Sequence, residues 1–513
     1  MTILLGREQR APLSTSVDVV IVGSGAGGAV VARELARAGH SVMVLEEGGY
    51  HPPEEYGKLS PSRALRTLAR EAGLGLAVGR GDTPIMSVLA GKCVGGSSVL
   101  TGGVCFRIPD EVLHDWSTNL GLTDLTPQAL APYFAEVEEA LSVETVPASM
   151  RSRSTELFVE GAERMGITMK SLRRNTSGCK GASRCNFGCP NGAKMSVDIS
   201  MLPDARAHGA VVVSDALVET IDVERGTARG VRGRFLDAST GEPGVAFEVK
   251  ARVVVVACGS LHTPILLRRS GLGSVHVGRH LTLHPAFRVG ALFDEKVEGW
   301  DGAMQSVYSD HFSDEGLTLV GVYTAPSVLA AAFPGVGREH RRIVKSLPHL
   351  AFFGAMIHDD GGGRVMRWLG REPLLTYRMS ARDRKRLWRG LEVLGELAVA
   401  AGAREVLLPI FGADPITSQA RLRALIAAPP STRKVECMSF HPLGSAKMSA
   451  DPRDGVVQST GETWSTRNLF VADGSVLPSS IGVNSQLPVM AMAMRIARGI
   501  ASEMGKLGRV AAA

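Results

Sequence analysis

Three glycines near the N-terminus have the spacing of a dinucleotide-binding turn. Gly23, Gly25 and Gly28 form G-x-G-x-x-G directly after the run VDVVIV and at the start of a helical pattern. The first glycine permits a tight bend, the second lets the backbone approach a pyrophosphate, and the third lets helix and strand pack closely. The pyrophosphate is expected at the helix N-terminus, beside Ala26. A purely structural turn is the alternative, and the motif alone does not choose between FAD and NAD.

An acidic residue lies where a ribose-binding carboxylate is expected. Glu46 ends the second expected strand, 23 residues after Gly23. A carboxylate at this place can accept hydrogen bonds from ribose hydroxyls, and it would repel a 2′-phosphate. Glu46 therefore strengthens the prediction of a dinucleotide site.

Three cysteines are clustered in a glycine-rich loop, residues 178–194. Cys179, Cys185 and Cys189 lie in GCKGASRCNFGCPNGAK. Their thiolates could hold an iron–sulfur cluster, could bind zinc with a fourth ligand, or could stay free in a tight loop. The other cysteines occur singly and are expected to be small core residues: Cys93, Cys105, Cys258 and Cys437.

A parallel sheet with covering helices is needed to position these residues. Residues 17–22 and 41–45 are typical of buried strands, and 26–38 of the helix between them. Further strands are expected at 211–221, 252–257 and 468–472, followed by a helix from about residue 489. Because these strands are far apart in the chain, the nucleotide-binding domain is expected to be discontinuous.

The middle of the chain has a different pattern. Strands are expected near 351–357 and 374–379, and a long helix over 381–401 with a C-terminal cap at Gly402. We therefore expect an α/β protein in which a substrate domain, 286–434, is inserted between two parts of a Rossmann-type domain, 1–285 and 435–513.

Composition restricts the function classes. The 513 residues carry a formal net charge of only +6, which gives no reason to expect nucleic acid. The N-terminus has no signal-peptide pattern, so a cytoplasmic protein is expected. Residues 317–336 carry no charge, but Pro326 and Pro334 argue against a membrane span. A buried helix is favoured there over a lid or a patch that contacts a membrane peripherally.

Three segments resemble the glucose-methanol-choline oxidoreductases. GSLHTPILLRRSGLG, residues 259–273, resembles the second signature of that family, and GKCVGGSSVL, residues 91–100, resembles the first. Thr101 departs from it, because the family usually has Asn or His there. Residues 439–448 and 468–497 resemble the closing segment.

The resemblance implies FAD as the cofactor, a flavin-binding domain and a substrate domain built on an antiparallel sheet. Backbone N–H groups of the first signature would lie close to the flavin, the loop before the last helix would contact it, and one backbone position would reach the adenine. The residues implied are, in that order, Gly95, Gly96 and Ser97, then Asp473 and Gly474, then Val218.

The resemblance also implies two catalytic positions. Oxidation of an alcohol by a flavin needs a base for the hydroxyl proton while hydride leaves the carbinol carbon for N5. The family's histidine falls on His441 and its second position on Asn484. His441 would be the base, and the Asn484 amide would orient the oxygen. The alternatives are a hydrogen-bonded core histidine and an Asx turn.

A looser similarity, in residues 321–335 (GVYTAPSVLAAAFPG), 358–365 (HDDGGGRV) and the run ending AAGAREV at residue 406, suggests the long-chain fatty alcohol oxidase branch. It implies a lipophilic alcohol as substrate, with oxygen or another acceptor as electron partner. The cysteine loop partly resembles that of bacterial FAD-dependent sugar dehydrogenases, where an iron–sulfur cluster carries electrons away, but Lys180 follows Cys179 where those enzymes have adjacent cysteines. A hydroxynitrile lyase or a fatty acid photodecarboxylase is the competing function.

Overall fold

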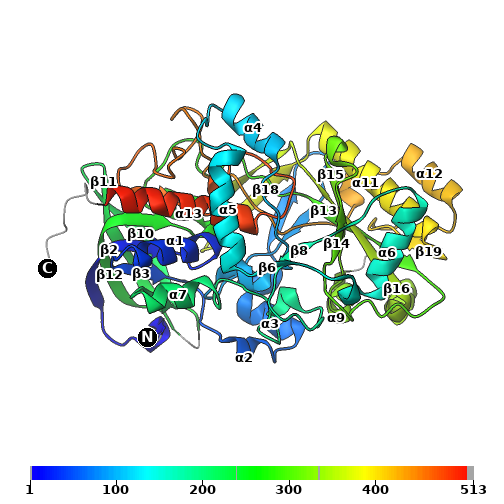
Figure 1. The fold of residues 1–513 in the computed structure, drawn as a ribbon, viewed down its shortest axis with the longest axis horizontal. Helices are drawn as coiled ribbons and strands as arrows, with labels where there is room; N and C mark the ends of the chain where they lie inside the picture. Colours follow the sequence, from blue (N-terminus) through cyan, green and yellow to red (C-terminus); the bar gives the residue numbers. More distant parts are fainter. Residues whose placement is uncertain (1–2, 238–239, 333–334, 505–513) are drawn as a thin grey trace.

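The computed structural model describes residues 3–237, 240–332 and 335–504, and it contains two large sheets (Figure 1). The first sheet has the order β1-β9-β3-β2-β12-β11-β10, with β21 also paired to β12. Its strands are β1 (Leu4–Leu5), β2 (Leu13–Val22), β3 (Val42–Leu45), β9 (Val211–Ser214), β10 (Ala216–Glu224), β11 (Thr227–Leu236), β12 (Pro243–Val256) and β21 (Leu469–Val471).

The parallel core of this sheet carries the dinucleotide fingerprint. β2 pairs in parallel with β3 and with β12, and β21 adds in parallel to the end of β12. The last four residues of β2 are buried, as is expected for a strand covered on both faces. Helix α1 (Ala26–Arg37) starts directly after the turn and packs against α7 (Met201–Ala207) and α13 (Gln486–Glu503). Helices from both ends of the chain therefore cover one sheet (Figure 1).

The second sheet is mostly antiparallel and has the order β17-β18-β4-β5-β20-β13-β16-β15-β14-β7, with β19 paired to β13. Its strands are β4 (Leu76–Gly79), β5 (Met86–Val88), β7 (Lys170–Ser171), β13 (Ala286–Leu292), β14 (Val307–Ser309), β15 (Leu317–Gly321), β16 (Leu350–Ile357), β17 (Gly362–Arg367), β18 (Pro373–Arg378), β19 (Glu405–Leu407) and β20 (Cys437–Ser439). A separate pair joins β6 (Val143–Thr145) and β8 (Arg173–Asn175).

Helices α6 (Arg153–Arg164) and α11 (Ala381–Ala400) cover one face of the second sheet, where Phe158 and Phe353 stack with ring centroids 4.6 Å apart. The remaining α-helices are α2 (Pro53–Tyr56), α3 (Pro61–Leu68), α4 (Asp110–Thr118), α5 (Pro127–Ala140), α8 (Gly259–Arg269), α9 (Pro326–Ala332), α10 (Gly337–Lys345) and α12 (Gln419–Ala427). Helix α8 contacts β10 of the first sheet and β17 of the second, so it joins the two layers.

The predicted fold class, α/β with a Rossmann-type sheet and an antiparallel second sheet, is confirmed. Two elements differ from expectation. Residues 211–221 form two strands, because the chain turns at Asp215, whose φ is +54°. Residues 317–321 form a strand with alternating burial rather than the start of a buried helix, and α9 follows. Pro334 lies outside the described residues. The domain boundaries stay a prediction.

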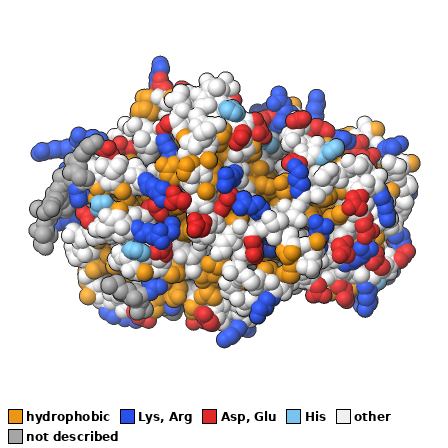
Figure 2. Space-filling view, in the orientation of Figure 1, with side chains coloured by type: hydrophobic (Ala, Val, Ile, Leu, Met, Phe, Trp, Pro, Cys, Tyr) orange, Lys and Arg blue, Asp and Glu red, His pale blue; other side chains and the backbone are white. Residues whose placement is uncertain are grey.

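Charges are mixed on the molecular surface. On the face shown in Figure 2, Lys and Arg side chains are interspersed with Asp and Glu, in line with the small net charge. Within the described ranges, no helix has both the length and the apolar character needed to cross a bilayer.

Candidate active site

The glycine fingerprint forms one wall of a cavity of about 490 Å³ that residues of both sheets line. Gly23 has a φ of +100°, and a Cβ there would lie 2.3 Å from the Ala257 oxygen. A Cβ on Gly28 would lie 2.0 Å from the Gly23 oxygen. A Cβ on Gly25 would meet only the Gly96 Cα, at 3.9 Å. Packing therefore requires the first and third glycines, whereas the second keeps the cavity open, as a bound pyrophosphate would need.

A fourth glycine was missed by the sequence analysis. A Cβ on Gly27 would lie 1.8 Å from the Ala472 oxygen, so α1 and the segment after β21 approach each other backbone to backbone. Both Gly27 and Ala26 line the cavity. The two adjacent glycines in GAGG were the sequence pattern that could have indicated this close approach. Ala472, which Gly27 contacts, lies more than 400 residues further along the chain.

The glycine-rich turn after β2 holds the Glu46 side chain by hydrogen bonds. Its Oε2 accepts hydrogen bonds from the Ser24 N–H at 2.9 Å and the Ser24 hydroxyl at 2.8 Å, and its Oε1 accepts from the Gly48 N–H at 2.8 Å. Burial raises the pKa of Glu46 above its usual range. The side chain lines the cavity, so the carboxylate is fixed at the place predicted for the ribose.

The first signature lies against the fingerprint. A Cβ on Gly96 would be 2.8 Å from the Gly25 Cα, and Gly96 and Ser97 line the cavity. The Ser97 hydroxyl accepts from the Gly91 N–H at 2.9 Å. Gly95 does not line the cavity, because its N–H donates to the Ser24 hydroxyl at 3.0 Å. Of these three residues, two therefore line the cavity, but the Gly96 N–H donates to the Cys93 carbonyl oxygen at 2.8 Å.

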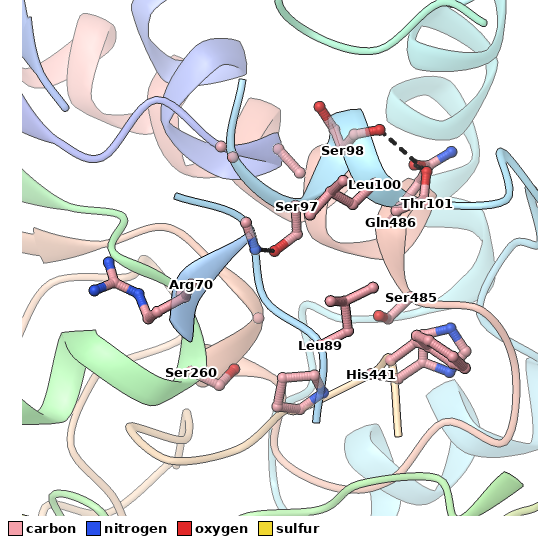
Figure 3. Close-up of a pocket in the computed structure, with 18 of the residues that line it drawn as sticks. Arg70, Leu89, Ser97, Ser98, Leu100, Thr101, Ser260, His441, Ser485 and Gln486 are labelled. Atoms are coloured by element: carbon pink, nitrogen blue, oxygen red, sulfur yellow. Dashed lines mark hydrogen bonds between the residues drawn. The ribbon is translucent and has the colours of Figure 1, made fainter. Parts of the chain in front are cut away.

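Thr101, where the chain departs from the family pattern, lines the cavity and donates to Gln486 Oε1 at 3.0 Å. Figure 3 shows Thr101 and Gln486 beside each other, with Ser97 on the same segment. The threonine therefore connects the first signature to the N-terminus of α13.

The remaining predicted cofactor residues also lie at the cavity. Val218 lines it from β10, and Gly474 lines it from the loop after β21. Both carboxylate oxygens of Asp473 accept hydrogen bonds from this chain, from Gly259 N at 2.8 Å and from Ser475 N at 2.8 Å. The Asp473 side chain thus joins the C-terminal loop to the start of α8, and Asp473 itself lines the cavity.

His441 and Asn484 meet at the cavity although 43 positions separate them. His441 follows β20 and Asn484 precedes α13, and Asn484 Nδ2 lies 3.2 Å from His441 Nε2. Burial, and then the neighbouring His284, lowers the pKa of His441 to about 3, so its imidazole is neutral near pH 7. In Figure 3, His441 and Ser485 lie at one side of the pocket and Arg70 at the other.

The second sheet supplies the other wall near His441. Its inward face is largely apolar, with Val320 on β15 and Met356 on β16. One ion pair interrupts it, since Arg288 and Glu436 line the cavity with Nη2 and Oε1 3.4 Å apart. The sequence analysis missed this pair, which adjacent strands bring together.

Arg70 was also missed, and it is the centre of a largely buried charge network. Its Nη2 lies 2.7 Å from Glu47 Oε2, and its Nη1 lies 2.9 Å from Glu372 Oε1. His262 Nε2 is 3.2 Å from the other oxygen of Glu372. Burial alone would raise the pKa of Glu47, but Arg70 lowers it well below its usual range. The network joins the end of β3 to the segment before β18.

The cysteine loop is held by cations of the protein. Cys185 and Cys189 are buried and Cys179 is partly exposed. Arg174 donates to Cys185 Sγ at 2.9 Å, and Lys194 Nζ donates to the carbonyl oxygen of Cys185 at 2.9 Å. In the part of the chain that the structure describes, no three His, Cys, Asp or Glu side chains gather as metal ligands. The structure therefore does not support the iron–sulfur alternative.

Comparison with known proteins agrees with this geometry. Residues 17–286 and 371–493 match the two family models described as GMC oxidoreductase. An uncharacterised GMC-type oxidoreductase of Mycobacterium tuberculosis H37Rv is 39% identical over 97% of this chain and 77% of its own length. A long-chain-alcohol oxidase of Arabidopsis thaliana is 31% identical over 95% of this chain and 67% of its own length.

Solved structures share the fold. Pyridoxine 4-oxidase from Mesorbium loti superposes with a TM-score of 0.71 at 19% identity, over 94% of this chain and 98% of its own. A formate oxidase variant of Aspergillus oryzae, studied for its FAD modification, gives 0.71 at 18% identity, over 96% and 99%. The chain therefore belongs to the glucose-methanol-choline (GMC) oxidoreductase family and is an FAD-dependent oxidoreductase.

Proposed function

We propose that this oxidoreductase acts on the CH–OH group of a lipophilic alcohol, with His441 as the base. The observation that carries the proposal is the 3.2 Å approach of Asn484 Nδ2 to His441 Nε2 at the cavity. An oxygen placed within reach of both atoms would accept from Asn484 and donate to His441. Because the Asn484 amide nitrogen can only donate, Nε2 of the neutral imidazole is the acceptor of this contact, which is the protonation state that a base needs.

The cofactor would be held by Gly25, Gly96 and Ser97 at the pyrophosphate side, by Glu46 at the ribose and by Val218 near the adenine. The bound flavin supplies the acceptor for the hydride of the carbinol carbon. Asn484 orients the hydroxyl, and His441 Nε2 receives its proton.

The lipophilic substrate is supported by the wall beside this pair. The uncharged segment contributes several described residues to the lining of the cavity, among them Val320, Val322 and Leu329. Their apolar surfaces would cover an alkyl chain. The long-chain-alcohol oxidase of Arabidopsis is named for such substrates.

The test is anaerobic reduction of the flavin in the purified holoenzyme by butanol, octanol and dodecanol, with glucose as a polar control. Each buried methylene contributes about 0.8 kcal/mol, so the reduction rate divided by the dissociation constant should rise several-fold per two carbons. In His441→Ala the reduction should be slower by about 10² to 10⁴ with FAD retained, whereas the exposed His114→Gln should behave as wild type.

If no alcohol bleaches the flavin, the alcohol proposal fails and a non-redox or light-driven activity takes its place. A flat response to chain length, or a preference for glucose, would refute the lipophilic substrate alone.

A further inference from the structure

A second histidine lies behind His441 and outside the cavity. His284 is fully buried, at 0% exposure, and precedes β13. Its φ is +49°, a left-handed conformation that is uncommon for residues other than glycine. Backbone strain of this kind persists only where the surroundings enforce it, and it is concentrated at functional sites.

The surroundings that enforce this conformation are built around one carboxylate. Asp359, which is 3% exposed, accepts from Leu283 N at 3.0 Å and from His284 N at 3.3 Å. The Tyr377 hydroxyl also donates to Asp359. The Asp359 carboxylate therefore fixes the backbone of His284.

The His284 ring connects both members of the proposed catalytic pair. Its Nε2 accepts from Ile481 N at 3.1 Å and from Gly482 N at 3.3 Å, which lie three and two positions before Asn484. Its ring meets the ring of His441 edge-on, with centroids 5.4 Å apart and planes at 65°. Because Nε2 accepts two hydrogen bonds, the proton of the neutral ring must be on Nδ1. This ring is thus fixed in position and in tautomer.

We propose that His284 is a positioning residue that sets the distance between His441 and Asn484. Two N–H groups fix the loop that carries Asn484, and the ring edge supports the plane of His441. The inference rests on the proposed function, since it concerns the geometry in which an alcohol oxygen is received. A shift of about 1 Å at such a pair is enough to slow the reaction by about 10².

The experiment compares three variants of the holoenzyme. His284→Asn tolerates the left-handed backbone but loses the acceptor at the Nε2 position, and His284→Gln keeps an acceptor there but loses the ring. His358→Gln is the matched control, because His358 contacts the same loop through Ser480 O at 3.2 Å. We expect flavin reduction at saturating octanol to slow by about 10 to 100-fold in His284→Asn and by about 3 to 10-fold in His284→Gln. The alcohol dissociation constant and the FAD content should stay unchanged, and His358→Gln should match wild type.

Wild-type reduction rates in both His284 variants would overturn the proposal. If His284→Asn does not fold, the rate in His284→Gln decides in the same way. A second readout separates this proposal from the proposed function: the ¹⁵N spectrum of histidine-labelled holoenzyme, with His441 assigned from His441→Gln. If no alcohol reduces wild type but the His441 signal shifts in the His284 variants and not in His358→Gln, the positioning role holds and the alcohol function fails. An unshifted signal overturns the positioning role.

Discussion

Buried neutral histidines are the most informative single residues of this site. Burial, and then His358, lowers the pKa of His284 from 6.5 to about 3. Below pH 6.5 the unfolded chain binds a proton at this position that the folded protein does not bind. The contribution of His284 to the free energy of unfolding should therefore be fully present above pH 6.5. It should decrease by about 1.4 kcal/mol per pH unit as the pH falls from 6.5 towards 3.

The predicted loss of stability at low pH can be tested directly. Between pH 7 and pH 5, urea unfolding of wild type should lose about 2 kcal/mol more than His284→Gln, because glutamine does not titrate. The difference between the two proteins removes the contributions of the groups that do not interact with His284. An equal loss in both would show that His284 is charged or accessible in the folded state.

Residues differed in how well the sequence revealed them. Gly23, Gly25, Gly28 and Glu46 were found because their chemistry is local: one strand, one turn and one helix bring them together. His441 and Asn484 were found only through resemblance, and their roles stay proposals. The other participants, His284, Arg70 and Gly27, owe their environments to contacts with Ile481, Glu372 and Ala472, and no local pattern encodes such contacts.

At the scale of elements, the approach of α1 to the segment after β21 should be the least tolerant contact. Gly27→Ala places a Cβ 1.8 Å from a backbone oxygen that cannot move aside as a side chain would. We expect a loss of about 1 to 3 kcal/mol or more in unfolding free energy, with weakened FAD binding, measured by urea unfolding and FAD titration.

Gly499→Ala is the matched control for this prediction. Gly499 lies exposed in α13, and a Cβ there would have no neighbour within 4 Å. Alanine at such a helix position is expected to stabilise by about 0.5 to 1 kcal/mol. If Gly27→Ala behaved like Gly499→Ala, the close packing of α1 would be refuted.

The hydrophobic pattern of the sequence predicted some helices and strands better than others. The hydrophobic runs before Gly23 and over residues 351–357 predicted β2 and β16 to within a few residues, since buried strands have continuous apolar sequences. Residues 317–321 alternate between buried and partly exposed positions, the period of a strand, but the uncharged composition of the whole segment suggested a helix. The choice between helix and strand depends on the pairing of residues 317–321 with β14 and β16, which lie outside this segment.

At the scale of the whole molecule, Arg70 joins parts of the chain that belong to different layers. Arg70→Met would remove a cationic partner from Glu47, which is 15% exposed, and from Glu372, which is 33% exposed, and removing one ion of a largely buried pair is costly. Since Arg70, Glu47 and His262 all line the cavity, FAD should dissociate at least about tenfold faster. The measurement is the recovery of flavin fluorescence after dilution, at low and high salt.

The control is Arg382→Met, which removes a surface ion pair with Asp360 in which Arg382 is 72% exposed. Such pairs contribute little, so release should match wild type. Because salt screens a largely buried pair only weakly, high salt should change the release from wild type and from Arg70→Met by similar factors. Equal rates in all three proteins would show that the network does not retain the cofactor.

The first sheet begins with β1 and is completed by β21, and this order has a consequence for biosynthesis. A chain still on the ribosome has β12 but lacks β21, the Ala472 contact of α1 and the α13 cover until residues 435–504 have emerged. The apolar end of β12 is then open to chaperones or to aggregation. The first sheet is therefore complete only after β21 and α13 have been synthesised, so we expect FAD to bind after these elements have joined the fold.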